Sequence, residues 1–443
     1  MKKYTFPMGG IHLDKHKLTS GMPIIPAGLP EFVYIPVRQH IGAPAKVLVQ
    51  KGDKVKVGTQ LADADGIVSA DIHSSVSGEV VKIDEIVSDS GYPTLMIVIK
   101  VEGDEWEPSI DRSPEVVKEI PFTPQEIVQK IREAGIVGMG GAGYPTPIKT
   151  TLPEGKKVDY LILNGIECEA YLTADDRLMV EKAEQIIIGA KIINRALGIQ
   201  NAIIAIDENK PEAIEIMSNL TRRYVGVNVR VCASKYPQGA EKQLIKAITG
   251  REVPSRGLPL DIGCIVQNVG TVYAVYEAVM KNKPLFERII TVSGDECADK
   301  PANYLVRVGT PASYLINRSC SDTSKIGKII FGGAMMGTAA VNLDAPVTKL
   351  TSGILLLNDR DAVKPAETAC IRCGKCVDVC PMGLRPFAIA SAVKNNDELN
   401  ELRRLHALDC IECGSCAFTC PAKIPLLDYC KLGKMELRKQ TRS

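Results

Sequence analysis

The chain has 443 residues, and its formal net charge of +2 excludes a broadly basic nucleic-acid binder. A hydrophobic content of 45% excludes wholesale disorder, and the length predicts roughly two to four domains at about 100–200 residues each. Eight of the 14 cysteines lie in two short runs, Cys370–Cys380 and Cys410–Cys420. Such clustering in a long chain indicates metal ligation rather than a disulfide framework.

No membrane or secretion signal is apparent in the sequence. Two lysines near the N-terminus are not followed by an apolar run, which argues against a signal peptide. The longest apolar stretches, Ile186–Ala190 and Gly353–Leu357, are far shorter than the ~18–20 residues that cross a bilayer. We therefore expect a chain that meets a membrane only through other proteins.

Residues 1–115 have the pattern of a small β domain. Turn chemistry at Lys51–Gly58 precedes expected strands at Val76–Ile83 and Leu95–Lys100. This order resembles the barrel-sandwich fold of lipoyl and biotinyl carrier domains. Those carriers modify a lysine at a hairpin tip, but the comparable stretch Gly66–Ile72 has no lysine. The sequence therefore predicts a docking domain rather than a swinging arm.

The next part of the chain alternates between helix and strand. Thr123, Pro124 and Glu126 form a helix start with a capping box. Strands are then expected at 158–163, 202–206 and 227–232, and helices at 173–197, 210–223 and 238–249. This order predicts a three-layer α/β domain over 121–285, a small α+β, β-grasp-like domain over 286–355 and a helical domain over 360–443.

The two cysteine runs share the pattern C-x-x-C-x-x-C-x-x-x-C-P. In two-cluster ferredoxins the fourth cysteine of each run ligates the other 4Fe-4S cluster. This rule predicts a first cluster on Cys370, Cys373, Cys376 and Cys420, and a second on Cys410, Cys413, Cys416 and Cys380. Paired zinc sites are the alternative, but zinc needs only one C-x-x-C pair per half. The remaining cysteines are expected to be small buried apolar residues: Cys168, Cys232, Cys264, Cys297, Cys320 and Cys430.

A glycine loop at Gly138–Gly143 satisfies the pattern G-x-G-x-x-G. A Rossmann loop follows a strand and opens a helix, whereas this loop follows a predicted helix and precedes Pro145 and Pro147. The pattern alone leaves two alternatives open, a tight turn without a ligand or a backbone cradle for a phosphate. We expect Gly140 and Gly141 to let the backbone approach a ligand without a Cβ in the way, since glycine tolerates the positive-φ turns that such loops often need.

Four motifs in this region together resemble the flavoprotein subunit of respiratory complex I. Residues 138–149 resemble its loop G-R-G-G-A-G-F-P-T-G-x-K, and residues 164–169 resemble N-A-D-E-x-E. Residues 236–244 match Y-x-x-G-E-E-T-A-L, and residues 266–269 match V-N-N-V. With the barrel-sandwich and the cysteine runs, the whole chain is similar to the RnfC family, one of the components of Rnf electron-transport complexes. These complexes pass electrons between ferredoxin and NAD and couple the transfer to ion movement across a membrane.

The resemblance implies roles for particular residues. The FMN phosphate loop comprises Gly138, Gly140, Gly141, Gly143 and Lys149. The residues implied to line the flavin are Asn164, Glu167, Tyr236, Gly239, Gln267 and Asn268. Those implied to face the nicotinamide nucleotide are Tyr144 and the candidate catalytic residues Glu169 and Glu241. The family's arginine, aspartate, first glutamate and first asparagine are replaced by Met139, Ile166, Ala240 and Gln267. The first two departures change the polar contacts offered to the flavin.

Electron chemistry connects these motifs. NADH gives up a hydride, whereas an iron–sulfur cluster accepts one electron at a time, and a flavin can serve both. We therefore expect an oxidoreductase subunit with FMN, two 4Fe-4S clusters and NAD(H) as substrate. Its expected partners are integral membrane subunits and a ferredoxin-like iron–sulfur subunit, and its expected place is peripheral, on the cytoplasmic side of the cell membrane.

Two other functions remain open. A cobalamin reductase-like flavoprotein shares the flavin loop and the cluster motifs, but its glycine loop lies near the N-terminus without about 110 residues before it. A flavin-less electron-relay and docking subunit is kept open by Met139 and Ile166, which replace polar residues of the motif.

Overall fold

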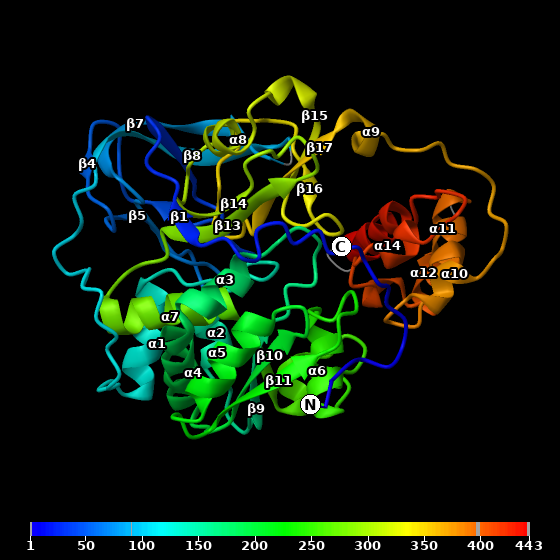
Figure 1. The fold of residues 1–443 in the computed structure, drawn as a ribbon, viewed down its shortest axis with the longest axis horizontal. Helices are drawn as coiled ribbons and strands as arrows, with labels where there is room; N and C mark the ends of the chain where they lie inside the picture. The colour runs from blue at the N-terminus through cyan, green and yellow to red at the C-terminus, as the bar shows by residue number, and fades with distance from the viewer. Residues whose placement is uncertain (1, 90, 396–398, 441–443) are drawn as a thin grey trace.

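The computed structural model describes residues 2–89, 91–395 and 399–440. Four parts follow one another along the chain (Figure 1). A β domain and a mixed-sheet domain lie on one side, an α/β domain lies below them, and the cysteine runs belong to a separate helical domain. In the described ranges, no helix combines the length and apolar character that a bilayer crossing requires.

The β domain is the expected barrel-sandwich. One antiparallel sheet has the order β2-β8-β7-β4, and a second has the order β3-β5-β6. Their bounds are β2 (Phe32–Pro36), β3 (Lys46–Val47), β4 (Lys54–Val55), β5 (Gln60–Asp63), β6 (Ile72–His73), β7 (Ser77–Val87) and β8 (Pro93–Gly103). Alternate apolar residues such as Val33, Ile35, Ile97 and Ile99 face a shared core, because strand side chains point to opposite faces in turn.

The N-terminal arm, residues 2–23, lies outside this domain, although we expected residues 1–115 to form one unit. Tyr4 forms a parallel bridge with Cys232, and Ile11 forms an antiparallel bridge with Tyr236. The following strand, β1 (Ile24–Pro26), joins the sheet of the third domain. Burial of Phe6 and Ile11 holds the arm against the α/β and cluster domains, which the barrel-sandwich pattern could not reveal.

The α/β domain has a parallel sheet of four strands in the order β11-β10-β9-β12. Its elements are α1 (Pro124–Glu133), α2 (Thr146–Thr150), β9 (Tyr160–Gly165), α3 (Ala174–Glu181), α4 (Ala183–Leu197), β10 (Ala202–Asp207), α5 (Pro211–Thr221), β11 (Val227–Cys232), α6 (Glu241–Thr249), β12 (Cys264–Asn268) and α7 (Val269–Lys281). The chain runs outward from β9 to β11 and then returns to place β12 on the other side of β9. The strand order therefore reverses between β9 and β12, which makes this a topological switch point.

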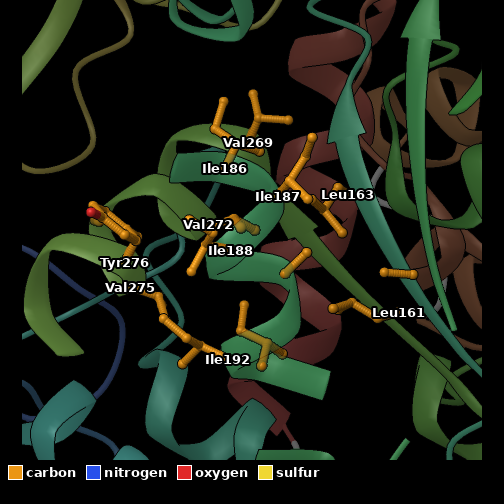
Figure 2. Close-up of a cluster of buried hydrophobic side chains, with 14 of the residues drawn as sticks. Leu161, Leu163, Ile186, Ile187, Ile188, Ile192, Val269, Val272, Val275 and Tyr276 are labelled. Atoms are coloured by element: carbon orange, nitrogen blue, oxygen red, sulfur yellow. The ribbon is translucent and has the colours of Figure 1, made fainter. Parts of the chain in front are cut away.

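Helices cover both faces of this sheet. Leu161 and Leu163 of β9 point into a cluster with α4 and α7 (Figure 2), whereas Ile162 packs on the opposite face with Leu244 of α6. Strands buried on both faces read as continuous apolar runs, as 161–163 does. The three-layer arrangement follows from this two-sided burial.

The third domain is larger than the expected insert because it recruits β1 from the N-terminus. Its mixed sheet has the order β1-β14-β13-β17-β15-β16. The elements are β13 (Glu287–Gly294), β14 (Ala302–Arg307), α8 (Ala312–Ser319), β15 (Ile326–Phe331), β16 (Thr338–Ala339) and β17 (Gly353–Asn358), followed by α9 (Asp359–Ala362). Leu315 and Ile316 of α8 pack into the core of this sheet.

The helical domain contains two similar halves. Its helices are α10 (Lys375–Asp378), α11 (Pro386–Lys394), α12 (Leu399–Arg404), α13 (Ser415–Phe418) and α14 (Leu426–Gln440). Gly374 and Gly414, which precede α10 and α13, have φ angles of 77° and 76°. Glycine suits these left-handed positions because it has no Cβ. Each short helix therefore begins with the same tight turn inside a cysteine run.

We predict that Ile187→Ala destabilises the α/β domain by about 2–5 kcal/mol, because Ile187 is fully buried beside Leu163 (Figure 2). Thermal and denaturant unfolding of the purified chain, followed by circular dichroism, measures this effect. Val225→Ala is the matched control, since Val225 is 95% exposed and should shift the unfolding free energy by less than about 0.5 kcal/mol. Equal effects of the two substitutions would contradict the assigned core.

Candidate functional site

Three of the expected flavin motifs meet at the carboxyl edge of the parallel sheet. Asn164 lies near the end of β9, Asn268 ends β12, and Gly239 follows β11. The Asn164 amide donates to the carbonyl oxygen of Gly239 at 2.8 Å, and the Asn268 amide donates to the carbonyl oxygen of Asn164 at 3.5 Å. Asn268 is also the N-cap of α7, where its side chain accepts from the Gly270 N–H. The switch point thus brings together segments about 100 residues apart.

The glycine loop lies against the start of α7. The Met139 N–H donates to the hydroxyl of Thr271 at 2.9 Å, and a Cβ added to Gly140 would lie 2.9 Å from the Cβ of Asn268. Gly143 has a φ angle of +69°, whereas Gly140 and Gly141 do not have positive φ angles. A glycine is needed at position 140 because a Cβ there would press against Asn268. Gly143 supplies the left-handed turn.

Lys149 lies in the last turn of α2 and points to the end of the neighbouring strand. Its ammonium donates to the carbonyl oxygen of Val266 and pairs with the Glu241 carboxylate, both at 3.1 Å. The expected phosphate cation and one expected nucleotide-facing carboxylate are therefore partners. Their side chains are 29% and 41% exposed, so both remain accessible.

The residues at this edge fit FMN by their chemistry. The Gln267 side chain is buried, and its amide nitrogen has no hydrogen-bond partner among the described residues. A buried donor without a partner costs about 1–3 kcal/mol, so an acceptor on a ligand would relieve it. A Cβ added to Gly141 would have no heavy atom within 4 Å, which leaves room beside the loop. Lys149 adds a positive charge, and Tyr144, in the same motif, is half-buried.

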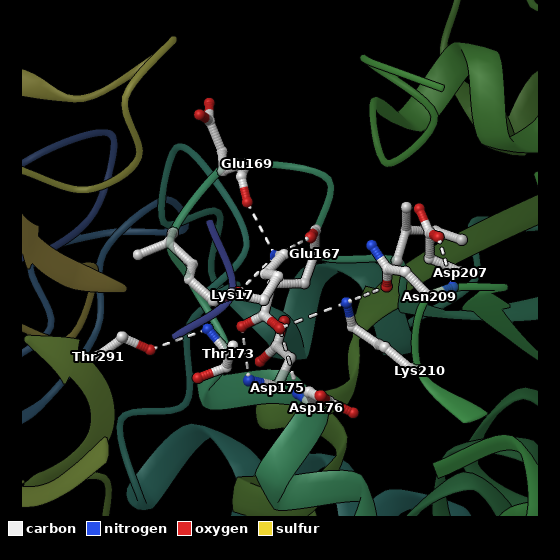
Figure 3. A network of polar contacts seen from close by, with 12 residues as sticks. Lys17, Glu167, Glu169, Thr173, Asp175, Asp176, Asp207, Asn209, Lys210 and Thr291 are labelled. Atoms are coloured by element: carbon white, nitrogen blue, oxygen red, sulfur yellow. Dashed lines mark hydrogen bonds and ion pairs between the residues drawn. The ribbon is translucent and has the colours of Figure 1, made fainter. Parts of the chain in front are cut away.

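Glu167 lies in a buried polar network rather than facing open space (Figure 3). Its carboxylate accepts the backbone N–H groups of Asp175 at 2.8 Å and Asp176 at 3.3 Å, and lies 3.6 Å from the ammonium of Lys210. Burial, with Glu167 nearby, raises the pKa of Asp175 to about 7. Both carboxylate oxygens of Glu167 thus accept backbone N–H groups at the start of α3, and the residue shapes the loop after β9.

Lys17 was missed by the sequence analysis. Its ammonium crosses from the N-terminal arm and donates to the carbonyl oxygens of Glu167 at 2.9 Å, Glu169 at 2.8 Å and Leu172 at 2.5 Å (Figure 3). Burial lowers the pKa of Lys17 to about 8. The loop after β9 therefore wraps around one ammonium group. No local signal marks this lysine, because its partners lie about 150 residues further along the chain.

Tyr236 and Glu169 connect the flavin motifs to other domains. The Tyr236 hydroxyl donates to the carbonyl oxygen of Cys413 at 2.7 Å, inside the second cysteine run. The Glu169 carboxylate accepts the backbone N–H groups of Met335 and Met336 in the third domain. Burial raises the pKa of Glu169. Of the two candidate catalytic residues, Glu241 is therefore the accessible one.

The cysteines approach one another across the two runs. Burial raises the pKa of Cys380 to about 11, and the thiols of Cys413 and Cys410 add to this rise. The pKa of Cys376 is raised by burial and by the nearby thiols of Cys416 and Cys420. Cys380 thus lies near the second run and Cys420 near the first, which fits the crossed ligand sets. No trio of described His, Cys, Asp or Glu side chains is close enough to bind one metal ion, so the case for two cubanes rests on spacing and proximity.

Cys430 is a further cysteine at this place. It is buried on α14, and the nearby thiols of Cys410 and Cys416 raise its pKa. One turn later, Lys434 donates to the carbonyl oxygen of Cys410 at 2.7 Å. The i, i+4 spacing of Cys430 and Lys434 places both on one helix face. Cys430 is buried as expected, but it also lies against the second run, which its sequence position does not indicate.

Comparison with known proteins defines the class. Residues 131–277 match the family described as Nuo51 FMN-binding domain, residues 4–104 match the RnfC barrel sandwich hybrid domain, and residues 369–424 match the 4Fe-4S dicluster domain. The chain thus belongs to the class of proteins that combine a Nuo51-type FMN-binding domain with a 4Fe-4S dicluster domain.

Three relatives identify the family within that class. The chain is 46% identical to the subunit designated C of the proton-translocating ferredoxin:NAD(+) oxidoreductase complex of Clostridium ljungdahlii, over 97% of this chain and 93% of that one. It is 41% identical to the Na(+)-translocating counterpart of Acetobacterium woodii, over 98% and 97% of the two chains. It is also 41% identical to the corresponding subunit of the ion-translocating oxidoreductase complex of Rhodobacter capsulatus, over 88% and 75%. The chain belongs to the RnfC family.

We predict that Cys380→Ala damages the second cluster, whose other ligands come from Cys410–Cys416, and leaves the first cluster intact. The reason is the proximity of Cys380 to Cys410 and Cys413. Anaerobic iron analysis should fall from about eight irons towards about four, and electron paramagnetic resonance should retain one cluster signal. Cys297→Ala, outside both runs, is the control. Loss of the first cluster alone would overturn the crossed assignment.

Proposed function

We propose that the chain exchanges electrons between NAD(H), FMN and two 4Fe-4S clusters, as the nucleotide-handling subunit of an ion-translocating ferredoxin:NAD oxidoreductase. The names of its relatives support this activity, since two of them are described as belonging to ferredoxin:NAD(+) oxidoreductase complexes. The family assignment and the FMN-binding and dicluster domains agree with it.

One observation carries the proposal most directly: the carboxyl edge of the parallel sheet adjoins a cysteine run. Tyr236, from the flavin motif after β11, donates its hydroxyl hydrogen to the carbonyl oxygen of Cys413 at 2.7 Å. The second cluster would therefore be the neighbour of the flavin. The first cluster would be the outer one, since Cys370 and Cys373 are exposed whereas Cys413 is buried.

The residues of the edge suit separate tasks. Gly140 and Gly141 allow the backbone to approach a phosphate, and Lys149 adds a point charge suited to that group. The buried amide of Gln267 can donate to a flavin heteroatom, and the carboxylate of Glu241 can accept from ribose hydroxyls or a carboxamide. Bound FMN would supply the conversion between hydride transfer and single-electron transfer.

The partner proposal follows from the exposed cluster loop. Ile371 is 68% exposed between Cys370 and Cys373, so the first run offers an apolar contact next to a cluster ligand. A ferredoxin-like iron–sulfur subunit would dock there and exchange electrons with the first cluster. Integral membrane subunits would hold the chain peripherally on the cytoplasmic side of the membrane.

A flavin-less relay subunit is the second candidate, and two of the four departures from the motif favour it. Met139 and Ile166 replace an arginine and an aspartate, and both side chains are buried in apolar clusters. They therefore offer no polar contact to a flavin. The spectrum of anaerobically purified protein separates the candidates, because only the first predicts flavin absorbance that NADH bleaches.

Gly141→Val should abolish FMN binding without disturbing the fold. In the protein itself the new side chain has room, since a Cβ at Gly141 would have no heavy atom within 4 Å, so any loss reflects exclusion of the ligand. Fluorescence titration of FMN into deflavinated protein measures this, and iron content reports the integrity of the clusters. Gly21→Val, also in open surroundings, is the control. Wild-type FMN affinity in Gly141→Val would make the loop a structural turn.

Lys149→Ala should weaken FMN binding by about tenfold, the low end of the range for a hydrogen bond to a charged group, because this ammonium is partly exposed and shared with Glu241. The same titration at two salt concentrations measures it, and the difference should shrink at high salt as charges are screened. Lys157→Ala, an exposed lysine eight residues further on, controls for net charge. A salt-independent loss would point to a packing role instead.

A further inference from the structure

The loop Gly332–Gly337 of the third domain, with the sequence Gly-Gly-Ala-Met-Met-Gly, lies between β15 and β16. We call it the methionine loop. Its backbone reaches the α/β domain, where the Met335 N–H donates to one carboxylate oxygen of Glu169 at 2.9 Å and the Met336 N–H donates to the other at 3.0 Å. Both oxygens of a candidate nucleotide-facing residue are therefore held by another domain.

The glycines allow this close approach. A Cβ added to Gly333 would lie 2.3 Å from the carboxyl carbon of Glu169, so only glycine fits in this arrangement. Gly332 has a φ angle of +98°, which other residues rarely adopt. A Cβ at Gly337 would lie 2.4 Å from the carbonyl oxygen of Gly333. The loop is thus folded tightly on itself and against the carboxylate.

The other side of the methionine loop meets the second cysteine run. Met335 packs in an apolar cluster with Tyr236 and Cys413, and its carbonyl oxygen lies 3.2 Å from the ideal Cβ position of Gly414. Met336, by contrast, is 55% exposed. The loop therefore fills the space between Glu169 and the cluster run, with its tip at the solvent.

The charge of Glu169 explains why these contacts are exchangeable. No ion pair joins Glu169 to a cation within residues 2–89, 91–395 and 399–440, although the ammonium of Lys17 lies on its carbonyl oxygen. A partly buried carboxylate is costly unless it is hydrogen-bonded, so Glu169 depends on donors such as the two loop amides. Hydroxyl groups of a ribose or the N–H groups of a carboxamide are donors of the same kind. A ligand could replace the amides without leaving the carboxylate unsatisfied.

We propose that the methionine loop is a lid: its amides hold Glu169 until a nicotinamide nucleotide donates to the same carboxylate and displaces them. This inference rests on the proposed function, since it requires a nucleotide to bind at this edge. Only molecules with an open lid bind the nucleotide. The apparent affinity is therefore the intrinsic affinity multiplied by the fraction of molecules in which the lid is open.

Two measurements on the full chain with FMN and clusters test the lid. Gly333→Ala should hold it open, because the added Cβ meets Glu169, and should tighten NADH binding by about threefold or more. Gly21→Ala, with no neighbour within 4 Å, should leave the affinity unchanged. In the wild type, saturation with NAD+ should speed hydrogen exchange of the Met335 and Met336 amides by about tenfold, whereas simple burial by ligand would slow it.

The outcomes separate the lid from the proposed function. If NADH fails to bleach the flavin of the wild type, the proposed function itself is wrong. If NADH bleaches the flavin but exchange of the two amides is unchanged or slower on nucleotide binding, and Gly333→Ala binds NADH as the wild type does, the lid is wrong. A variant that fails to fold would lose its flavin spectrum, and the exchange measurement on the wild type then decides.

Discussion

The return of β12 to the side of β9, away from β11, is the constraint on which the candidate site depends. Because all four strands are parallel, their carboxyl ends share one edge of the sheet. The loops that leave β9 and β12 run in opposite directions, which opens a crevice between them. The glycine loop can then approach Asn268 at the start of α7. With β12 beside β11, two strands would separate Asn268 from Asn164 and the four motifs would not converge.

Backbone carbonyl and N–H groups, rather than charge pairs, carry much of the contact between domains. Lys17 donates to three carbonyl oxygens in the loop after β9, and the Glu169 carboxylate accepts two amides from the third domain. The fully buried ammonium of Lys349 donates to the carbonyl oxygens of Asp71 at 2.7 Å and Gly135 at 2.8 Å, which joins three domains at one atom. Such contacts satisfy a buried charge without a partner of opposite sign. They also leave that charge dependent on the exact positions of loops.

Local patterns predicted the elements well where spacing carries the information. The capping box at Thr123 and Glu126 is present, and the strands and helices of the α/β domain follow the expected alternation. The crossed ligand sets that the cysteine spacing predicts stay a prediction, although the two runs do lie close together. The N-terminal arm was not predicted, since its partners Cys232 and Tyr236 lie more than 200 residues away and no periodicity links them.

The sequence by itself determined the spacing of the cysteines, the glycine loop, and the family to which both belong. These depend on residue type and short spacing, which the chain carries locally. Only the tertiary structure decided which groups are accessible. It pairs Lys149 with Glu241 and places Glu167 in a buried network with Lys210. The Glu169 carboxylate accepts two backbone N–H groups from a domain that no motif connects to it. The physical reason is that hydrogen-bond satisfaction of a buried charge is settled by whichever chain segment packs nearest, and that segment is chosen by the fold as a whole.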